Sequence, residues 1–149
     1  MQKPCGVRGG QGEEGLRRIR LITREEAFKR AEHIMNEYRA AYGIDFEIEH
    51  SFLPVELLVP TQAELSEVKL LVVLEEIKHG YDAPITVIPY GGRYYILDGH
   101  HRAFALWKLG FREAEALVLR PKVRFLPGVV RTAEKSGLRD LGDVKIVRD

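Results

Sequence analysis

The chain has 149 residues, of which 45% are hydrophobic and 30% are charged, and this balance excludes a disordered chain. The net charge of +1 argues against non-specific nucleic-acid binding by the whole surface, and the single cysteine, Cys5, excludes a disulfide framework and a cysteine-ligated zinc site. No apolar run reaches membrane-spanning length and no secretory signal is visible, so we expect a cytoplasmic protein with no membrane partner. Amides are scarce while Glu, Lys and Arg are abundant, which favours a thermophilic source.

The first fifteen residues differ from the rest because they are rich in glycine and polar residues and show no periodicity. We predict a flexible tail over 1–15 and a single domain over 16–149. A basic cluster follows the tail, formed by Arg17, Arg18, Arg20 and Arg24. We interpret it as the solvated edge of the first helix, and the alternative is a contact for an acidic partner or nucleic acid.

A helix is predicted from Thr23 to Tyr42. Thr23 and Glu26 have the spacing of a capping box, and Gly43 stands where a left-handed cap would end the helix. Apolar residues recur on one face at Phe28, Ala31, Ile34, Met35, Tyr38 and Tyr42. This periodicity is typical of a face that packs on the core.

Extended segments and a second helix are predicted next. Apolar residues alternate with others over 46–59, and Pro54 indicates an edge or a bend rather than a central strand position. Thr61 and Glu64 have the spacing of another capping box. We therefore predict a helix from this point to about His79, with Gly80 as its cap.

The second half of the chain begins with a predicted hairpin. Its strands cover 84–89 and 93–97, and Gly91 and Gly92 form the tight turn between them. A short helix follows to Gly110, and a strand covers 114–119. From residue 120 we predict a basic C-terminal extension that contains a short helix over 133–136 and a last strand over 144–147.

The turn between strand 93–97 and its helix carries Asp98, Gly99, His100, His101 and Arg102. A strand that turns directly into a helix leaves the first helical N–H groups without partners, and these groups attract an anion. Glycine permits close approach of a ligand, and an arginine can bind two phosphate oxygens together. These residue types predict a cradle for phosphate or carboxylate, although Asp98 also fits a plain helix N-cap.

The segment Ile96-Leu97-Asp98-Gly99-His100-His101-Arg102, with Ala105-Leu106 and Leu109-Gly110, resembles the signature of the ParB/sulfiredoxin superfamily. The pair of histidines is most similar to archaeal ParB-like proteins that include an ADP-dependent free serine kinase. The resemblance covers roughly residues 46–119. It implies a compact α+β domain in which a small mixed sheet packs with helices.

The resemblance implies a nucleotide-binding protein. One activity that it implies is that of a phosphotransferase, which uses ADP or ATP with Mg²⁺ on a small hydroxylated metabolite. The diphosphate would lie on the N–H groups after Asp98 and contact His100, His101 and Arg102, and Asp98 would hold Mg²⁺. His101 would stabilise charge during transfer. The alternative is a non-catalytic module that binds nucleotide or DNA, related to chromosome-partitioning proteins.

Two positions separate these functions. The related serine kinases carry a catalytic glutamate two residues after a proline, and here the residue two after Pro60 is Gln62, which cannot act as a general base. Glu64 is the substitute candidate for the base, and Gln62 is a candidate nucleotide or substrate contact. Sulfinic acid reduction is not expected, because His100 stands where sulfiredoxins carry the reactive cysteine.

Overall fold

The structure, a computed structural model, describes residues 19–149. The predicted tail over 1–15, with Cys5, and the arginines at 17 and 18 lie outside the described residues. The helices are α2 (Arg24–Tyr42), α3 (Glu67–Lys78), α4 (His100–Lys108) and α5 (Gly128–Lys135), with short 3-10 turns η1 (Val55–Leu57) and η2 (Leu141–Asp143). The strands are β1 (Phe46–Pro54), β2 (Leu58–Val59), β3 (Glu64–Ser66), β4 (Ile85–Tyr90), β5 (Arg93–Asp98), β6 (Glu113–Pro121) and β7 (Lys145–Val147).

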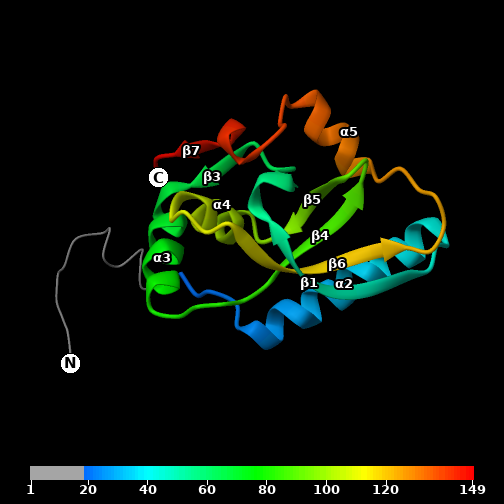
Figure 1. Ribbon diagram of the computed structural model, residues 1–149, viewed down its shortest axis with the longest axis horizontal. Coiled ribbons are helices and arrows are strands. Elements are labelled where there is room, and N and C mark those ends of the chain that lie inside the picture. Colours follow the sequence, from blue (N-terminus) through cyan, green and yellow to red (C-terminus); the bar gives the residue numbers. More distant parts are fainter. Residues whose placement is uncertain (1–18) are drawn as a thin grey trace.

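Five strands form a mixed sheet in the order β1-β6-β4-β5-β2. The β1–β6 and β4–β5 pairs are antiparallel, whereas β4–β6 and β5–β2 are parallel. Strands β3 and β7 pair in parallel as a separate two-stranded sheet beside α3 and α4 (Figure 1). The predicted α+β class, a small mixed sheet packed with helices, is confirmed.

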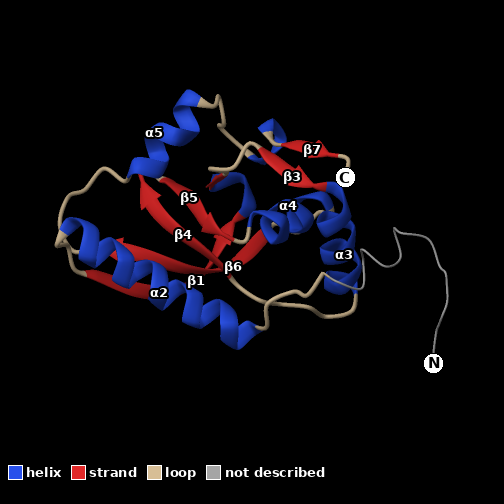
Figure 2. Ribbon diagram, turned by 180° about the vertical axis from the view of Figure 1, so that it is seen from behind, coloured by secondary structure: helices blue, strands red, loops and turns tan. Residues whose placement is uncertain are grey.

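The main sheet is covered on both faces. Buried side chains of β4 alternate between the two faces and pack into different apolar clusters. Ile85 and Val87 belong to the apolar cluster that contains Ala103 of α4. Ile88 belongs to another cluster, with Phe46 of β1 and side chains of α2. Figure 2 shows α2 running along the sheet, with α3 and α4 together at one end.

Helix α2 forms as the sequence predicts. The Thr23 hydroxyl accepts from the Glu26 N–H, the Glu26 carboxylate accepts from the Thr23 N–H, and Gly43 ends the helix with φ of 66°. The hairpin of β4 and β5 turns at Gly91 and Gly92, which both have positive φ, as predicted. Pro54 ends the edge strand β1, which agrees with its predicted place at an edge or bend.

The predicted start of the second helix at Thr61 is wrong. Helix α3 begins at Glu67, its N-cap is Ser66, and Glu64 lies in strand β3. The Thr61 hydroxyl donates to the Ile96 carbonyl at 2.6 Å instead of capping a helix. Strand β3 pairs with β7 from the far end of the chain, and this tertiary pairing overrides the local capping signal.

No helix within residues 19–149 is long and apolar enough to cross a membrane.

Candidate functional site

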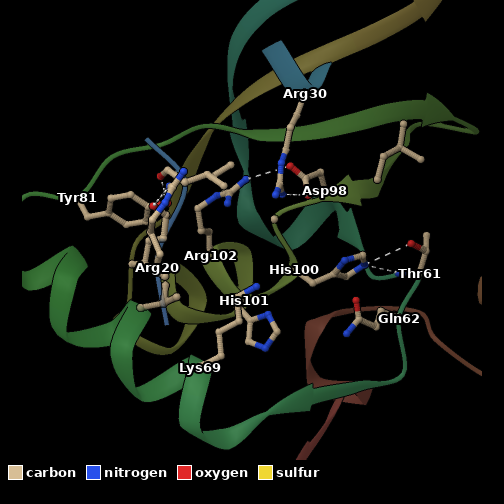
Figure 3. A pocket seen from close by; sticks show the side chains of 15 residues that line it. Arg20, Arg30, Thr61, Gln62, Lys69, Tyr81, Asp98, His100, His101 and Arg102 are labelled. Atoms are coloured by element: carbon tan, nitrogen blue, oxygen red, sulfur yellow. Dashed lines mark hydrogen bonds and ion pairs between the residues drawn. The ribbon is translucent and has the colours of Figure 1, made fainter. Parts of the chain in front are cut away.

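A cavity of about 520 Å³ opens at the N-terminal end of α4. Its walls come from the segment before α2, from α2 itself, from the segment after β2, from α3 and from the turn after β5 (Figure 3). Four basic side chains line it: Arg20, Arg30, Lys69 and Arg102. The carboxylate of Asp98 is the acidic group among the lining residues. The cavity is therefore strongly cationic in a protein whose net charge is only +1.

The first turn of α4 faces this cavity through Gly99, His100, His101 and Arg102. Gly99 is the N-cap, with φ of 97° and ψ of 31°, and no side chain caps the helix. The Asp98 N-cap considered from the sequence is therefore wrong. A helix N-terminus without a capping side chain presents N–H groups and a positive dipole end, which together suit an anion.

Gly99 is required by packing as well as by its backbone angle. A Cβ atom at this position would lie 2.7 Å from Nη2 of Arg102 and 2.8 Å from Cγ2 of Ile85. Ile85 is fully buried in the core. The glycine therefore lets the Arg102 guanidinium lie directly against the turn.

Arg102 is 9% exposed and is held from several sides. Its Nη2 atom donates to the Pro84 carbonyl at 3.2 Å and lies 3.5 Å from Oδ2 of Asp98. Oδ1 of Asp98 accepts from Nη1 of Arg30 at 3.3 Å. Asp98 thus lies between two guanidinium groups, and the predicted phosphate clamp, Arg102, is partly engaged in holding the turn together.

The two histidines hold the segment after β2. Nε2 of His100 accepts from the Thr61 N–H at 2.9 Å, and Nε2 of His101 accepts from the Ser66 N–H at 3.2 Å. Burial, together with the His101 ring, lowers the pKa of His100 to about 4. Burial, together with the Lys69 ammonium, lowers the pKa of His101 to about 4. Both imidazoles are therefore neutral near pH 7.

The other predicted site residues separate in space. Gln62 lines the cavity, and its amide nitrogen donates to the Glu64 carbonyl at 2.8 Å. The exposed Glu64 is not among the cavity-lining residues of the described chain. The structure therefore brings Gln62 together with Asp98, Gly99, His100, His101 and Arg102, but not Glu64.

Three basic lining residues were not predicted as site residues: Arg20, Arg30 and Lys69. Arg20 belongs to the basic cluster assigned to a solvated helix edge, and its guanidinium also pairs with Glu26 at 2.7 Å. Arg30 and Lys69 lie on exposed faces of α2 and α3, where a single basic residue carries no sequence signal. Only the tertiary arrangement places these side chains around one cavity.

Metal binding by the protein alone is not favoured by this arrangement. Within residues 19–149, no group of three or more His, Cys, Asp or Glu side chains is placed to hold a metal ion. The predicted magnesium ligand, Asp98, has guanidinium groups at 3.3 and 3.5 Å, and these cations compete with a bound metal for its oxygens.

Solved structures that are similar to this chain include a free serine kinase, a sulfiredoxin and a ParB. No protein-family model matches the chain. An uncharacterized protein of Methanocaldococcus jannaschii is 37% identical over 131 residues, which make up 87% of this chain and 49% of that protein. The chain thus spans about half the length of this relative.

Three solved structures give the scale of the structural similarity. Free serine kinase in complex with AMP is 27% identical with a TM-score of 0.43, and the match covers 52% of this chain and 34% of the kinase. Sulfiredoxin from Arabidopsis thaliana is 28% identical with a TM-score of 0.41, over 47% of this chain and 83% of that protein. A truncated ParB from Caulobacter crescentus with CTP-gamma-S is 23% identical with a TM-score of 0.44, over 58% of this chain and 49% of that chain.

Proposed function

We propose that this protein binds a nucleotide, with the phosphates at the N-terminus of α4. The main support is that the α4 N-terminus has no capping side chain and opens into a cavity with four basic side chains. Near pH 7 the two histidines are neutral, so the positive charge comes from Arg20, Arg30, Lys69 and Arg102. Phosphates carry the charge and the multiple acceptor oxygens that such donors recognise.

The size and the walls of the cavity fit a nucleotide. Its volume of about 520 Å³ lies within the range of roughly 300–1,000 Å³ typical of small-molecule sites. Part of the wall is apolar or aromatic, formed by Leu21, Ile22, Val73, Tyr81 and Leu97. These side chains offer a surface for the base and sugar, while the basic groups face the phosphates.

The Arg30 and Arg102 contacts to Asp98 favour charge neutralisation by protein cations over neutralisation by Mg²⁺. If Mg²⁺ enters with ADP or ATP, the phosphates supply most of its ligands and Asp98 supplies at most one. Nucleotide binding that requires no metal is therefore the expected behaviour. We therefore expect Asp98 to bind Mg²⁺ only when a nucleotide is bound, and not in the protein alone.

Phosphotransfer from ADP or ATP to a small hydroxylated metabolite is the second candidate function. It is favoured by the position of Gln62, which lines the same cavity as the turn. It is weakened because an amide cannot accept the substrate proton and because Glu64 does not line the cavity in the described chain. We therefore rank nucleotide binding above catalysis, with nucleic acid as a further ligand to test.

The test is calorimetric titration with ADP, ATP, CTP and a short DNA duplex, each with and without Mg²⁺. Lys69→Ala removes one cavity cation, and Lys78→Ala removes an exposed lysine of the same helix outside the cavity. We expect Lys69→Ala to weaken nucleotide binding roughly tenfold, with Lys78→Ala unchanged. Equal affinities for the two variants, or no nucleotide binding by the wild type, would refute the proposal.

Turnover separates the two candidate functions. Wild type and Gln62→Glu are incubated with ADP or ATP and a panel of hydroxylated acceptors, and the nucleotide products are measured. Phosphotransfer by the wild type would establish catalysis without a carboxylate at position 62. Transfer by Gln62→Glu alone would show a binding site that lacks only its base.

A further inference from the structure

The segment from Thr61 to Ser66 is joined at both ends to the first turn of α4. At one end, the Thr61 N–H donates to Nε2 of His100 at 2.9 Å. At the other end, the Ser66 N–H donates to Nε2 of His101 at 3.2 Å. Gln62 lies between these two points and lines the cavity beside Thr61 (Figure 3). The two adjacent histidines thus span the whole segment.

Both contacts require a neutral imidazole of one tautomer. A backbone N–H can only donate, so Nε2 of each ring accepts and the ring proton lies on Nδ1. His100 is 9% exposed, which makes a charged ring costly at this position. The geometry alone therefore fixes the protonation state of both histidines.

We propose that His100 and His101 are positioning residues that hold residues 61–66 against α4, so that Thr61 and Gln62 form one wall of the nucleotide site. This inference rests on the proposed nucleotide-binding function for the identity of the ligand. The hydrogen bonds themselves are independent of that function. The role differs from the phosphate contact predicted for these residues from the sequence.

Charged neighbours act on the two rings in both directions: Arg102 and Lys69 favour the neutral form and Asp98 and Asp149 favour the charged form, and burial, the largest influence, keeps both rings neutral. His100 faces the His101 ring, Asp98 and Arg102, while His101 faces Lys69, Arg102 and Asp149. Protonation would convert each accepting nitrogen into a donor opposed to a backbone N–H. Acid should therefore release the Ser66 end of the segment, in the range where the His101 pKa of about 4 is reached.

The experiment reads the two amides directly. Hydrogen exchange at the Thr61 and Ser66 N–H groups is followed by NMR in wild type, His100→Gln, His100→Asn, His101→Gln and His101→Asn. The glutamine oxygen lies as many bonds from Cβ as Nε2 does, whereas the asparagine oxygen is one bond closer. His33→Asn is the control, because His33 is an exposed residue of α2 outside the cavity.

We expect each asparagine variant to reduce protection of its partner amide roughly tenfold, with protection retained in the glutamine variants and in His33→Asn. Wild-type protection of the Ser66 amide should also fall as the pH is lowered from 6.5 towards 4. Unchanged protection in His100→Asn and His101→Asn would overturn the proposal. Thermal melts of the same samples identify any variant that fails to fold, and the wild-type pH series tests the hydrogen bond between His101 and Ser66 without a substitution.

Nucleotide titration of the same variants then tests the consequence for the ligand. Weaker binding in the asparagine variants, restored in the glutamine variants, supports the positioning role. Lost amide protection with unchanged affinity would overturn the claim that the segment forms a wall of the site. If the wild type binds no nucleotide, the proposed function fails, whereas exchange at Thr61 and Ser66 still decides whether the histidines hold the segment.

Discussion

Substitution of Gly99 by alanine tests how the turn is built. Alanine at φ of 97° costs roughly 1–2 kcal/mol in any protein because Cβ approaches the following carbonyl. The added Cβ would also lie 2.8 Å from Cγ2 of Ile85 and 2.7 Å from Nη2 of Arg102. The arginine tip can shift only by weakening its contact with Pro84, and the isoleucine is fully buried. Overpacking of this kind adds roughly 1–3 kcal/mol.

Gly80→Ala is the matched control, because Gly80 has φ of 98° and a Cβ there would meet no atom within 4 Å. In urea denaturation, we expect Gly99→Ala to lose about 2–5 kcal/mol of the free energy of unfolding and Gly80→Ala about 1–2 kcal/mol. The difference between the variants isolates the packing of Arg102 and Ile85 on the turn. Equal losses would refute that packing argument.

Three further outcomes follow from the site. The free energy of unfolding should fall as the pH drops from 6.5 towards 4, because in this range the histidines bind protons in the unfolded state but stay neutral in the folded state. In urea denaturation at a series of pH values, His100→Gln should make the free energy of unfolding less dependent on pH. Ser66→Ala should cost about 1 kcal/mol, measured by urea denaturation, because the Ser66 hydroxyl accepts from the Lys69 N–H at 3.1 Å. Removal of Mg²⁺ with EDTA should leave the calorimetric affinity for ADP within about threefold, because Asp98 is already paired with arginine; a complete loss would show that the metal is required.

The parts of the fold that depend on local chemistry are predictable from the sequence. The capping box of Thr23 and Glu26 and the glycine pair at 91–92 determine the geometry of their own few residues. The same capping logic fails at Thr61, where the backbone N–H and the hydroxyl are taken by His100 and Ile96. These partners are more than thirty positions away, and no local pattern records them.

The candidate site is likewise predictable only where its residues are adjacent in the sequence. The turn is predictable because Asp98, Gly99, His100, His101 and Arg102 are adjacent in the sequence, and the structure places all five at one cavity. The remaining cations, Arg20, Arg30 and Lys69, come from separate elements, and only the folded structure brings them to the cavity. Glu64 is two residues from Gln62 along the chain, but the pairing of β3 with β7 places it in a strand away from the cavity.

Most polar side chains of the turn bond to other parts of the protein, and this limits which groups can contact a ligand. Both histidines accept backbone N–H groups and Arg102 supports Gly99, Pro84 and Asp98, so much of the turn's polar chemistry is used to build the turn itself. Ligand contact then falls to the first N–H groups of α4 and to cations that surround the turn. A turn of this construction offers an anion site whose ligand and chemistry are set by residues outside it. If the proposed nucleotide binding holds, positions such as Gln62 and Lys69, and not the turn itself, decide whether a phosphoryl group is also transferred.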